Sequence, residues 1–99
     1  MVIVRDVFQL KFGMAKDAIA AMKEIVPVMT KEMPNSMRVL VDVTGKSYTM
    51  VIEVEYPSLG AYEESMSKGS SDPAMQTWYG KFKPLCESSF KEVFKTVDL

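Results

Sequence analysis

The chain has 99 residues, of which 47% are apolar and 25% charged, the balance of one soluble globular domain spanning 1–99. Its net charge of −1 excludes the basic surplus that nucleic acid or an anionic membrane surface would attract. Histidine is absent, which removes the commonest general base, zinc ligand and haem ligand. We therefore expect no metal, no cofactor, no nucleic acid and no membrane as partners.

Two further observations bear on the compartment. No apolar run approaches the ~20 residues of a transmembrane helix, and the first residues do not resemble a signal peptide. Cys86 is the single cysteine and cannot form an internal disulfide, which favours a reducing compartment. We therefore expect a cytoplasmic protein.

The chain opens with a predicted strand and a predicted helix. Residues 2–12 alternate as a half-buried strand does. One face carries Val4, Phe8, Leu10 and Phe12, with Asp6 as the exception. Over 14–32 apolar residues recur every three or four positions, and this stripe extends to Met33, which predicts a helix. Pro27 should kink or loosen this helix, and Pro34-Asn35-Ser36 should end it.

The next two predicted strands form a hairpin. Residues 37–44 and 47–56 have strand patterns, and Gly45-Lys46 between them is a turn signal. The second of these strands alternates most cleanly along the chain. Its apolar face consists of Tyr48, Met50, Ile52, Val54 and Tyr56.

Two more helices and a last strand complete the prediction. A helix that begins near Pro57-Ser58 and ends before Gly69 should carry Leu59, Tyr62 and Met66 inward. Asp72-Pro73 predicts the start of the next helix, because an N-cap acceptor precedes a proline in the first turn. Pro84 should bend or end this helix, and 90–97 form the last strand. The apolar stripe of this helix is Met75, Trp78, Tyr79, Phe82, Leu85 and Cys86.

The predicted order of elements is therefore β-α-β-β-α-α-β. This order is that of the ferredoxin-like α+β fold, in which helices cover one face of a four-stranded antiparallel sheet. Right-handed crossovers would give the strand order 4-1-3-2.

The sheet face away from the helices is expected to mix aliphatic and charged side chains. Alternation places there Arg5, Val7, Gln9, Arg38, Leu40, Asp42, Val51 and Glu53, together with Ile3, Thr49 and either Val93 or Phe94. A solvated face would be polar throughout, and a second copy of the same sheet is the simplest cover for a mixed one. We therefore expect a homodimer through this face; a monomer with a mixed surface is the alternative.

A family resemblance lies in four segments: VIVRDVFQLKFG before an alanine-rich helix, VLVDVTGKSYTMVIEVEY, PSLGAYEE and DPAMQTWYGKFKPLCESS. In architecture and pattern the chain resembles the dimeric α+β barrel superfamily, closest to its NIPSNAP-like and antibiotic-biosynthesis-monooxygenase-like branches. The resemblance implies two ferredoxin-like subunits packed sheet to sheet. It carries no catalytic signature, and the superfamily includes monooxygenases, haem-degrading enzymes, isomerases and stress-induced proteins, so it does not fix a function.

The resemblance also suggests where chemistry would lie. The haem-degrading branch uses a first-strand asparagine, a tryptophan and a histidine; here histidine is absent and the only asparagine, Asn35, is in a predicted loop. A cofactor-free oxygenase or cyclase acting on an aromatic, polyketide-like substrate needs an apolar cavity, aromatic walls and one or two polar groups. The walls and hydroxyls could come from Tyr48, Tyr56, Tyr62, Trp78 and Tyr79. Candidate catalytic residues are Asp6, Tyr48, Tyr62 and Trp78, and candidate ligand-binding residues are Tyr62, Trp78, Tyr79, Met50 and Met22. For Trp78 and the methionines we favour the alternative that they only fill the core.

Polar residues on the strands leave alternatives open as well. A buried Asp6 would need a partner or have its pKa raised, which can create an acid-base site, whereas at the sheet rim it would be solvated. Arg5 and Glu53 would pair if the first and third strands are neighbours. They belong to a polar set on the outer face that also contains Gln9, Arg38 and Asp42. We favour salt bridges at the dimer interface as the role of this set over a barrel lumen that binds a small acid. Cys86, without a histidine to activate it, is interpreted as a small core residue.

Three functions remain as hypotheses. The first is a small-molecule-binding or accessory domain that binds itself and a small apolar or aromatic ligand. The second is the cofactor-free oxygenase or cyclase. The third is a subunit whose role is dimerisation itself. The first two predict an enclosed cavity beside Tyr62 and Trp78, and the third predicts tight packing there and an apolar outer patch.

Overall fold

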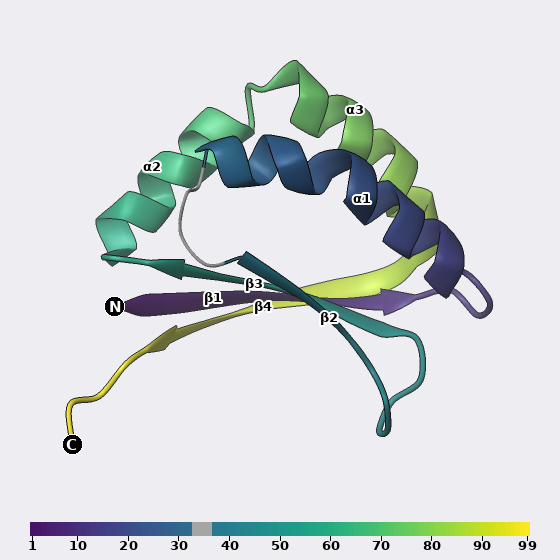
Figure 1. Ribbon diagram of the computed structural model, residues 1–99, viewed down its shortest axis with the longest axis horizontal. Helices are drawn as coiled ribbons and strands as arrows, with labels where there is room; N and C mark the ends of the chain where they lie inside the picture. Colours follow the sequence, from purple (N-terminus) through teal and green to yellow (C-terminus); the bar gives the residue numbers. More distant parts are fainter. Residues whose placement is uncertain (33–36) are drawn as a thin grey trace.

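Helices cover one face of a single antiparallel sheet in the structure, a computed structural model that describes residues 1–32 and 37–99 (Figure 1). The elements are β1 (Val2–Leu10), α1 (Ala15–Glu32), β2 (Met37–Val41), β3 (Thr49–Tyr56), α2 (Leu59–Gly69), α3 (Pro73–Phe82), the 3-10 turn η1 (Lys83–Leu85) and β4 (Cys86–Lys95). The strands lie in the order β2-β3-β1-β4. This is the predicted order read from the other edge, so the ferredoxin-like α+β fold is confirmed. No helix within these two ranges is long and apolar enough to cross a membrane.

The core lies between the helices and the two central strands. β1 and β3 pair from Val2 opposite Tyr56 to Gln9 opposite Thr49, so their alternating apolar residues share one face. Side chains from α1 and α3 pack on this face because both helices carry an apolar stripe. The buried residues of the cluster are Val4, Leu10, Ala18, Ala21, Met22, Ile25, Met29, Met50, Ile52, Val54, Tyr56, Trp78 and Phe82.

The first helix, α1, continues through Pro27 to Glu32. Proline has no N–H, so the carbonyl of Lys23, four residues earlier, loses its backbone partner. Three residues after the proline, the Thr30 hydroxyl donates to the Val26 carbonyl at 2.9 Å. The predicted end of this helix, with Met33 and Pro34-Asn35-Ser36, lies outside the described residues.

The hairpin strands β2 and β3 are shorter than the sequence pattern predicts. β2 ends at Val41 rather than residue 44, and β3 begins at Thr49 rather than residue 47. The Asp42 side chain accepts a hydrogen bond from the Thr49 backbone N–H at 3.0 Å and so ends the regular ladder. Gly45 supplies the expected positive φ of 95°, and Tyr48 also adopts a positive φ of 59°.

Both helix starts after the hairpin are confirmed. The Ser58 hydroxyl caps α2 by accepting from the Ala61 N–H at 3.1 Å, and Asp72 caps α3 by accepting from the Ala74 N–H at 2.8 Å. Pro73 occupies the first turn of α3. The helix ends at Phe82, and Pro84 lies in the short turn η1 that follows.

The last strand begins earlier than predicted. β4 starts at Cys86 rather than residue 90, and Cys86 pairs with Leu10 after a register shift at Gln9/Leu10. The prediction that Cys86 lies on the apolar stripe of a helix was therefore wrong. The thiol is half-buried and donates weakly to the Phe82 carbonyl, with 3.7 Å between Sγ and O. Residues 86–89 are mostly polar, and their extended conformation is set by pairing with β1 rather than by local sequence.

Three predicted inward residues point to solvent. Phe12 lies beyond the end of β1 and is 86% exposed. Leu59 and Met66 are 51% and 47% exposed, so the predicted inward face of α2 was wrong apart from Tyr62. The half-buried residues of α2 are Ala61, Tyr62, Ser65 and Gly69. The helix thus turns a face of mostly small side chains toward the sheet.

Candidate functional site

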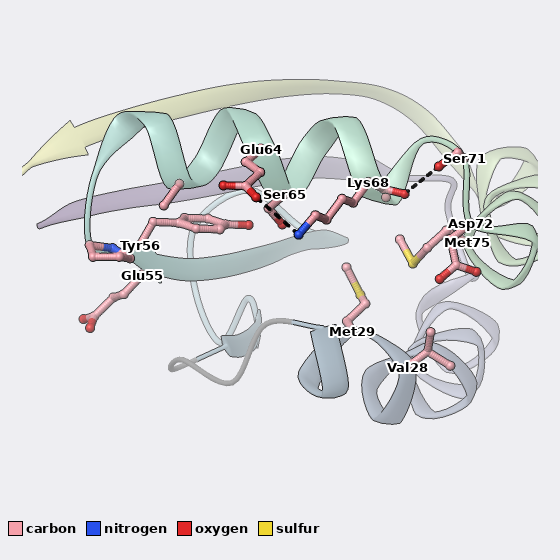
Figure 2. Close-up of a pocket in the computed structure, with 13 residues that line it drawn as sticks. Val28, Met29, Glu55, Tyr56, Glu64, Ser65, Lys68, Ser71, Asp72 and Met75 are labelled. Atoms are coloured by element: carbon pink, nitrogen blue, oxygen red, sulfur yellow. Dashed lines mark hydrogen bonds and ion pairs between the residues drawn. The ribbon is translucent and has the colours of Figure 1, made fainter.

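A pocket of about 490 Å³ opens where α1, α2, the end of β3 and the start of α3 meet (Figure 2). Its position follows from the small side chains on the inner face of α2. Ala61, Ser65 and Gly69, four residues apart, lie on one stripe of the helix and leave space that larger residues would fill. The lining consists of Val28, Met29, Glu55, Tyr56, Pro57, Ala61, Glu64, Ser65, Lys68, Gly69, Ser71, Asp72 and Met75.

The apolar part of the pocket comes from three different elements. Met29 of α1 and Met75 of α3 point toward each other across it, and the Tyr56 ring lies along its sheet side (Figure 2). Methionine is unbranched and polarizable, so such walls adapt to ligands of different shape. This surface suits the apolar body of a small organic molecule.

The Tyr56 hydroxyl is the most enclosed polar group of the pocket. It points toward Ser65 in Figure 2. Burial raises the pKa of Tyr56 above its ordinary value of 10.0, and the neighbouring Ser65 hydroxyl only partly offsets that rise. The phenol therefore stays protonated at neutral pH and offers a hydroxyl rather than a base.

Charged groups lie at the rim of the pocket. Lys68 pairs with Glu64 one turn earlier on α2, with 3.3 Å between Nζ and Oε1. The Ser71 hydroxyl donates to the Lys68 carbonyl at 3.0 Å, and Asp72 is engaged as the cap of α3. The Glu55 side chain points away from the pocket (Figure 2). The rim is therefore charged but largely paired within the fold.

Asp6 forms a second polar cluster next to the pocket. It faces Lys91 across the β1–β4 ladder, with 3.6 Å between Oδ1 and Nζ. Desolvation raises the pKa of Asp6, although the charge of Lys91 opposes this. The Lys91 ammonium lies 5.5 Å from the centre of the Tyr62 ring, which in turn packs edge-on against Tyr56 at 5.3 Å. The tyrosine contact joins the cluster to the pocket.

Lys91 is held in its charged form by this cluster. Burial by itself lowers the pKa of Lys91, but a hydrogen bond with Tyr62 and the charge of Asp6 outweigh it and leave the pKa raised. Asp6 and Lys91 therefore form an ion pair at neutral pH, and about a third of each side chain is exposed at the sheet edge. Asp6 has the partner that a half-buried carboxylate needs.

The other candidate residues lie apart from the pocket. Met22 and Met50 are buried in the core, and Tyr79 is 52% exposed on α3. Tyr48 lies in the hairpin loop, where its ring packs against Phe12 at 5.1 Å. None of the four lines the pocket.

Trp78 borders a second, shallower hollow of about 320 Å³ between α1 and α3. Its ring stacks on Phe82 at 4.8 Å, and its Nε1 is buried with no hydrogen-bond partner in the part of the chain that the structure describes. Glu24 and Lys81 form an ion pair across the same hollow at 3.5 Å. The stacking gives Trp78 the packing role that the sequence suggested.

Several lining residues were not predicted from sequence. Ser65, Lys68 and Met75 were not among the candidates, because two are polar residues on a helix and the third reads as core. The sequence feature that could have indicated the pocket is the recurrence of small residues at 61, 65 and 69, which places small side chains along one face of the helix. Within 1–32 and 37–99, no group of His, Cys, Asp and Glu side chains is placed to hold a metal ion.

The sheet face away from the helices is organised in rows that run across all strands. Cross-strand pairs place Arg38, Glu53, Arg5 and Glu92 side by side, and the next row is Leu40, Val51, Val7 and Phe90. The row beyond it is Asp42, Thr49, Gln9 and Ser88. The predicted residues of this face thus lie together, and the ambiguity in the last strand is settled, since Phe94 lies opposite Ile3 on this face and Val93 on the other.

The first of these rows alternates in charge from edge to edge. We call Arg38, Glu53, Arg5 and Glu92 the charge row. Arg5 lies 3.4 Å from Glu53 and 3.5 Å from Glu92, and Arg38 pairs with Glu53, so the expected Arg5–Glu53 pair is present. The neighbouring apolar row, by contrast, leaves Phe90 60% and Leu40 37% exposed.

Comparison with solved structures places this fold among known ones. A NIPSNAP family protein from Agrobacterium tumefaciens superposes with a TM-score of 0.91 at 17% identity, covering 98% of this chain and 86% of that chain. A NIPSNAP domain protein from Burkholderia xenovorans gives 0.89 at 13% identity, covering 98% and 95%. A Nitrosomonas europaea protein described as an antibiotic biosynthesis monooxygenase candidate gives 0.76 at 13% identity, covering 99% and 100%.

These likenesses confirm the resemblance at the level of fold. The structural neighbours are the two kinds of protein to which the sequence pattern pointed, NIPSNAP family proteins and monooxygenase-like proteins. No protein-family profile matches the chain, and no curated protein matches it in sequence. At such low identities a shared fold leaves the function to be argued from the site.

Proposed function

We propose that this protein is a small-molecule-binding domain and that its ligand lies in the pocket between α1, α2 and α3. The observation that carries the proposal is the pocket itself, which a stripe of small residues on α2 leaves between otherwise packed layers. Its volume of about 490 Å³ falls in the range of sites for small organic ligands. Met29, Met75 and the Tyr56 ring would hold an apolar or aromatic body, and the Tyr56 and Ser65 hydroxyls would bind one polar group.

Binding is favoured over catalysis by the state of the polar groups. A general base near neutral pH needs a pKa near the working pH, whereas burial moves the pKa of Tyr56 upward, away from it. Asp6, the other acid-base candidate, is paired with Lys91 and lies outside the pocket lining. Among the described residues of the lining, Glu64 is paired with Lys68 and Asp72 caps α3, so none of them gives the oxygenase or cyclase hypothesis a poised base, and the binding hypothesis needs none.

The test fills the pocket from α2 without touching the core. Ser65→Leu places a larger side chain in the pocket, and Ser67→Leu places the same side chain on the exposed face of the same helix as a matched control. Binding of the fluorescent probe 1-anilinonaphthalene-8-sulfonate is titrated against each variant and the unmodified protein. We expect Ser65→Leu to weaken binding about tenfold or more and Ser67→Leu to leave it unchanged. Equal binding by the two variants would overturn the proposal.

A second proposal concerns assembly: the protein forms a homodimer through the sheet face away from the helices. The specific observation is the apolar row, in which Phe90 and Leu40 are exposed beside a buried Val51. An apolar band flanked by polar rows is the pattern of an interface rather than of a solvated surface. Sedimentation equilibrium tests this directly. Phe90→Glu is expected to give a monomer, and Phe12→Glu, at a residue that is even more exposed but lies outside the face, is expected to stay dimeric. A monomeric unmodified protein would refute the proposal.

A further inference from the structure

We infer that the two copies of the proposed homodimer are related by a two-fold axis parallel to the strands, between β1 and β3, and that the charge row selects this axis. The inference rests on the proposed self-association and adds the geometry of the contact. It begins from the order of charges along the row. From β2 to β4 the order is Arg38, Glu53, Arg5, Glu92, or plus, minus, plus, minus.

The packing of two sheets limits where a two-fold axis can lie. When two copies of a sheet pack face to face, a two-fold axis relating them must lie in the plane between them. Rotation about an axis parallel to the strands leaves the position of each residue along its strand unchanged. It reverses the order of the four strands across the sheet. Each row then faces the same row of the other copy, with β2 opposite β4 and β3 opposite β1.

The charges of the row complement each other across this axis. Reversing plus, minus, plus, minus gives minus, plus, minus, plus, so every charge meets its opposite. Arg38 of one copy faces Glu92 of the other, and Glu53 of one copy faces Arg5 of the other. Burying four charges on each side is costly unless each is surrounded by partners of opposite sign. Pairing within the row and across the interface supplies partners in both directions.

The same axis also suits the two rows that lie between the charge row and the β2–β3 hairpin loop. The apolar row faces itself, with Leu40 opposite Phe90 and Val51 opposite Val7, so the most exposed aromatic of this row meets an aliphatic residue. In the polar row, Asp42 faces Ser88 and Thr49 faces Gln9, which are pairs able to form hydrogen bonds. Sheets that pack with aligned strands cross at about 30°. The central pair, Glu53 with Arg5, lies nearest the axis and is least displaced by that crossing.

Other axes fit the row less well. An axis running across the strands at the charge row would place each charge over its own copy, like against like. The same axis moved to the apolar row would lay the charge row over the polar row, where only Arg38 would meet an opposite charge, at Asp42. Like charges brought together at an interface oppose association.

The decisive experiment inverts the row and mixes the two proteins. A variant combining Arg5→Glu, Arg38→Glu, Glu53→Arg and Glu92→Arg keeps the alternation within its own sheet, so it should fold and form a dimer with itself. In a mixed dimer with the unmodified protein, every charge of the row would face one of the same sign. We expect native mass spectrometry of the two proteins, mixed in equal amounts and left to exchange, to show mixed dimers far below the statistical half.

Each other outcome has a defined meaning. Mixed dimers at the statistical half would show that the charge row does not face itself, and an excess of mixed dimers would indicate an axis across the strands. Either result overturns the inference and leaves the homodimer standing. If the unmodified protein is a monomer, the proposed self-association has failed instead.

A crosslinking experiment covers the case in which the inverted variant does not fold. In a Cys86→Ser background, Leu40→Cys and Phe90→Cys are made singly and together, and a short bis-maleimide joins nearby thiols. With the inferred axis, position 40 faces position 90 and is separated from its own copy by three strand spacings, about 14 Å. The double variant should give covalent dimers and the single variants should not. Dimers in the Leu40→Cys variant alone would contradict the inference.

Discussion

Asp6 and Lys91 face each other across the β1–β4 ladder on the helix side of the sheet, where a carboxylate interrupts an otherwise apolar row. The pair tolerates this position because β4 is an edge strand and about a third of each side chain stays exposed. Burial nevertheless raises the pKa of Asp6. The ion pair thus only partly repays the desolvation of the carboxylate.

The first prediction concerns pH. Because the pKa of Asp6 is raised in the folded state, its contribution to stability is full below its ordinary value of 3.8 and is lost as the pH rises through the folded pKa. Asp6→Asn should remove this decline and change stability at pH 7 by less than about 1 kcal/mol. Urea unfolding between pH 3 and pH 7 measures both. Asp98→Asn, near the chain end, serves as control and should keep the decline.

The second prediction concerns the pocket tyrosine. The raised pKa of Tyr56 means that the unfolded chain loses its phenolic proton first, so stability should fall as the pH rises through 10.0. Tyr56→Phe should make that fall shallower and should cost about 1 kcal/mol at pH 7, because it removes a largely buried hydroxyl that points toward Ser65. Unfolding free energies at pH 7 and pH 10.5 test this. The exposed Tyr79→Phe should change neither value, and an unchanged slope in Tyr56→Phe would contradict the assignment.

The third prediction concerns the aromatic cluster under α3. Phe82 is 1% exposed, stacks on Trp78 at 4.8 Å and meets Phe8 edge-on at 5.0 Å. Phe82→Ala should lower the free energy of unfolding by about 3–5 kcal/mol, since it removes a fully buried ring and leaves a cavity. Phe12→Ala, a change at an exposed site, should stay within about 0.5 kcal/mol. Denaturant midpoints of the two variants should therefore differ widely; similar midpoints would show that the cluster can collapse around the deletion.

The fourth prediction concerns the cap of α3. Asp72→Ala removes the acceptor for the Ala74 N–H and should cost about 1 kcal/mol, while Asp72→Asn keeps an acceptor and should cost less. Thermal unfolding followed by circular dichroism ranks the two variants. Equal losses in both would mean that the charge of Asp72 at the helix start, rather than its hydrogen bond, provides the stabilisation.

Much of the fold was predictable because its central elements obey simple periods. The alternation of β1 and β3 and the Asp72-Pro73 start of α3 are local signals that agree with the final packing. The start of β4 was missed because residues 86–89 are mostly polar and are extended by pairing with β1, a contact distant in sequence. Phe12 was misplaced because alternation does not reveal where a strand ends.

The pocket was harder to predict than the sheet. Leu59 and Met66 are the large aliphatic residues of α2, and periodicity placed them inward together with Tyr62, although only Tyr62 faces the sheet. The face of α2 that points toward the sheet carries the small residues Ala61, Ser65 and Gly69. The cavity exists because no large side chain fills the space beside them. The rows of the outer face, by contrast, required the exact cross-strand register, which pattern alone leaves open.

The small-residue stripe of α2 has a consequence for how this protein can diverge. The α2 residues that set the width of the pocket, Ala61, Ser65 and Gly69, are half-buried, and α2 contributes no fully buried residue to the core. Substitutions at 61 and 65 can therefore enlarge or shrink the cavity at little cost to folding. Descendants of one such chain could exchange one ligand for another through single changes on this helix, while the sheet and its two packed helices stay as they are.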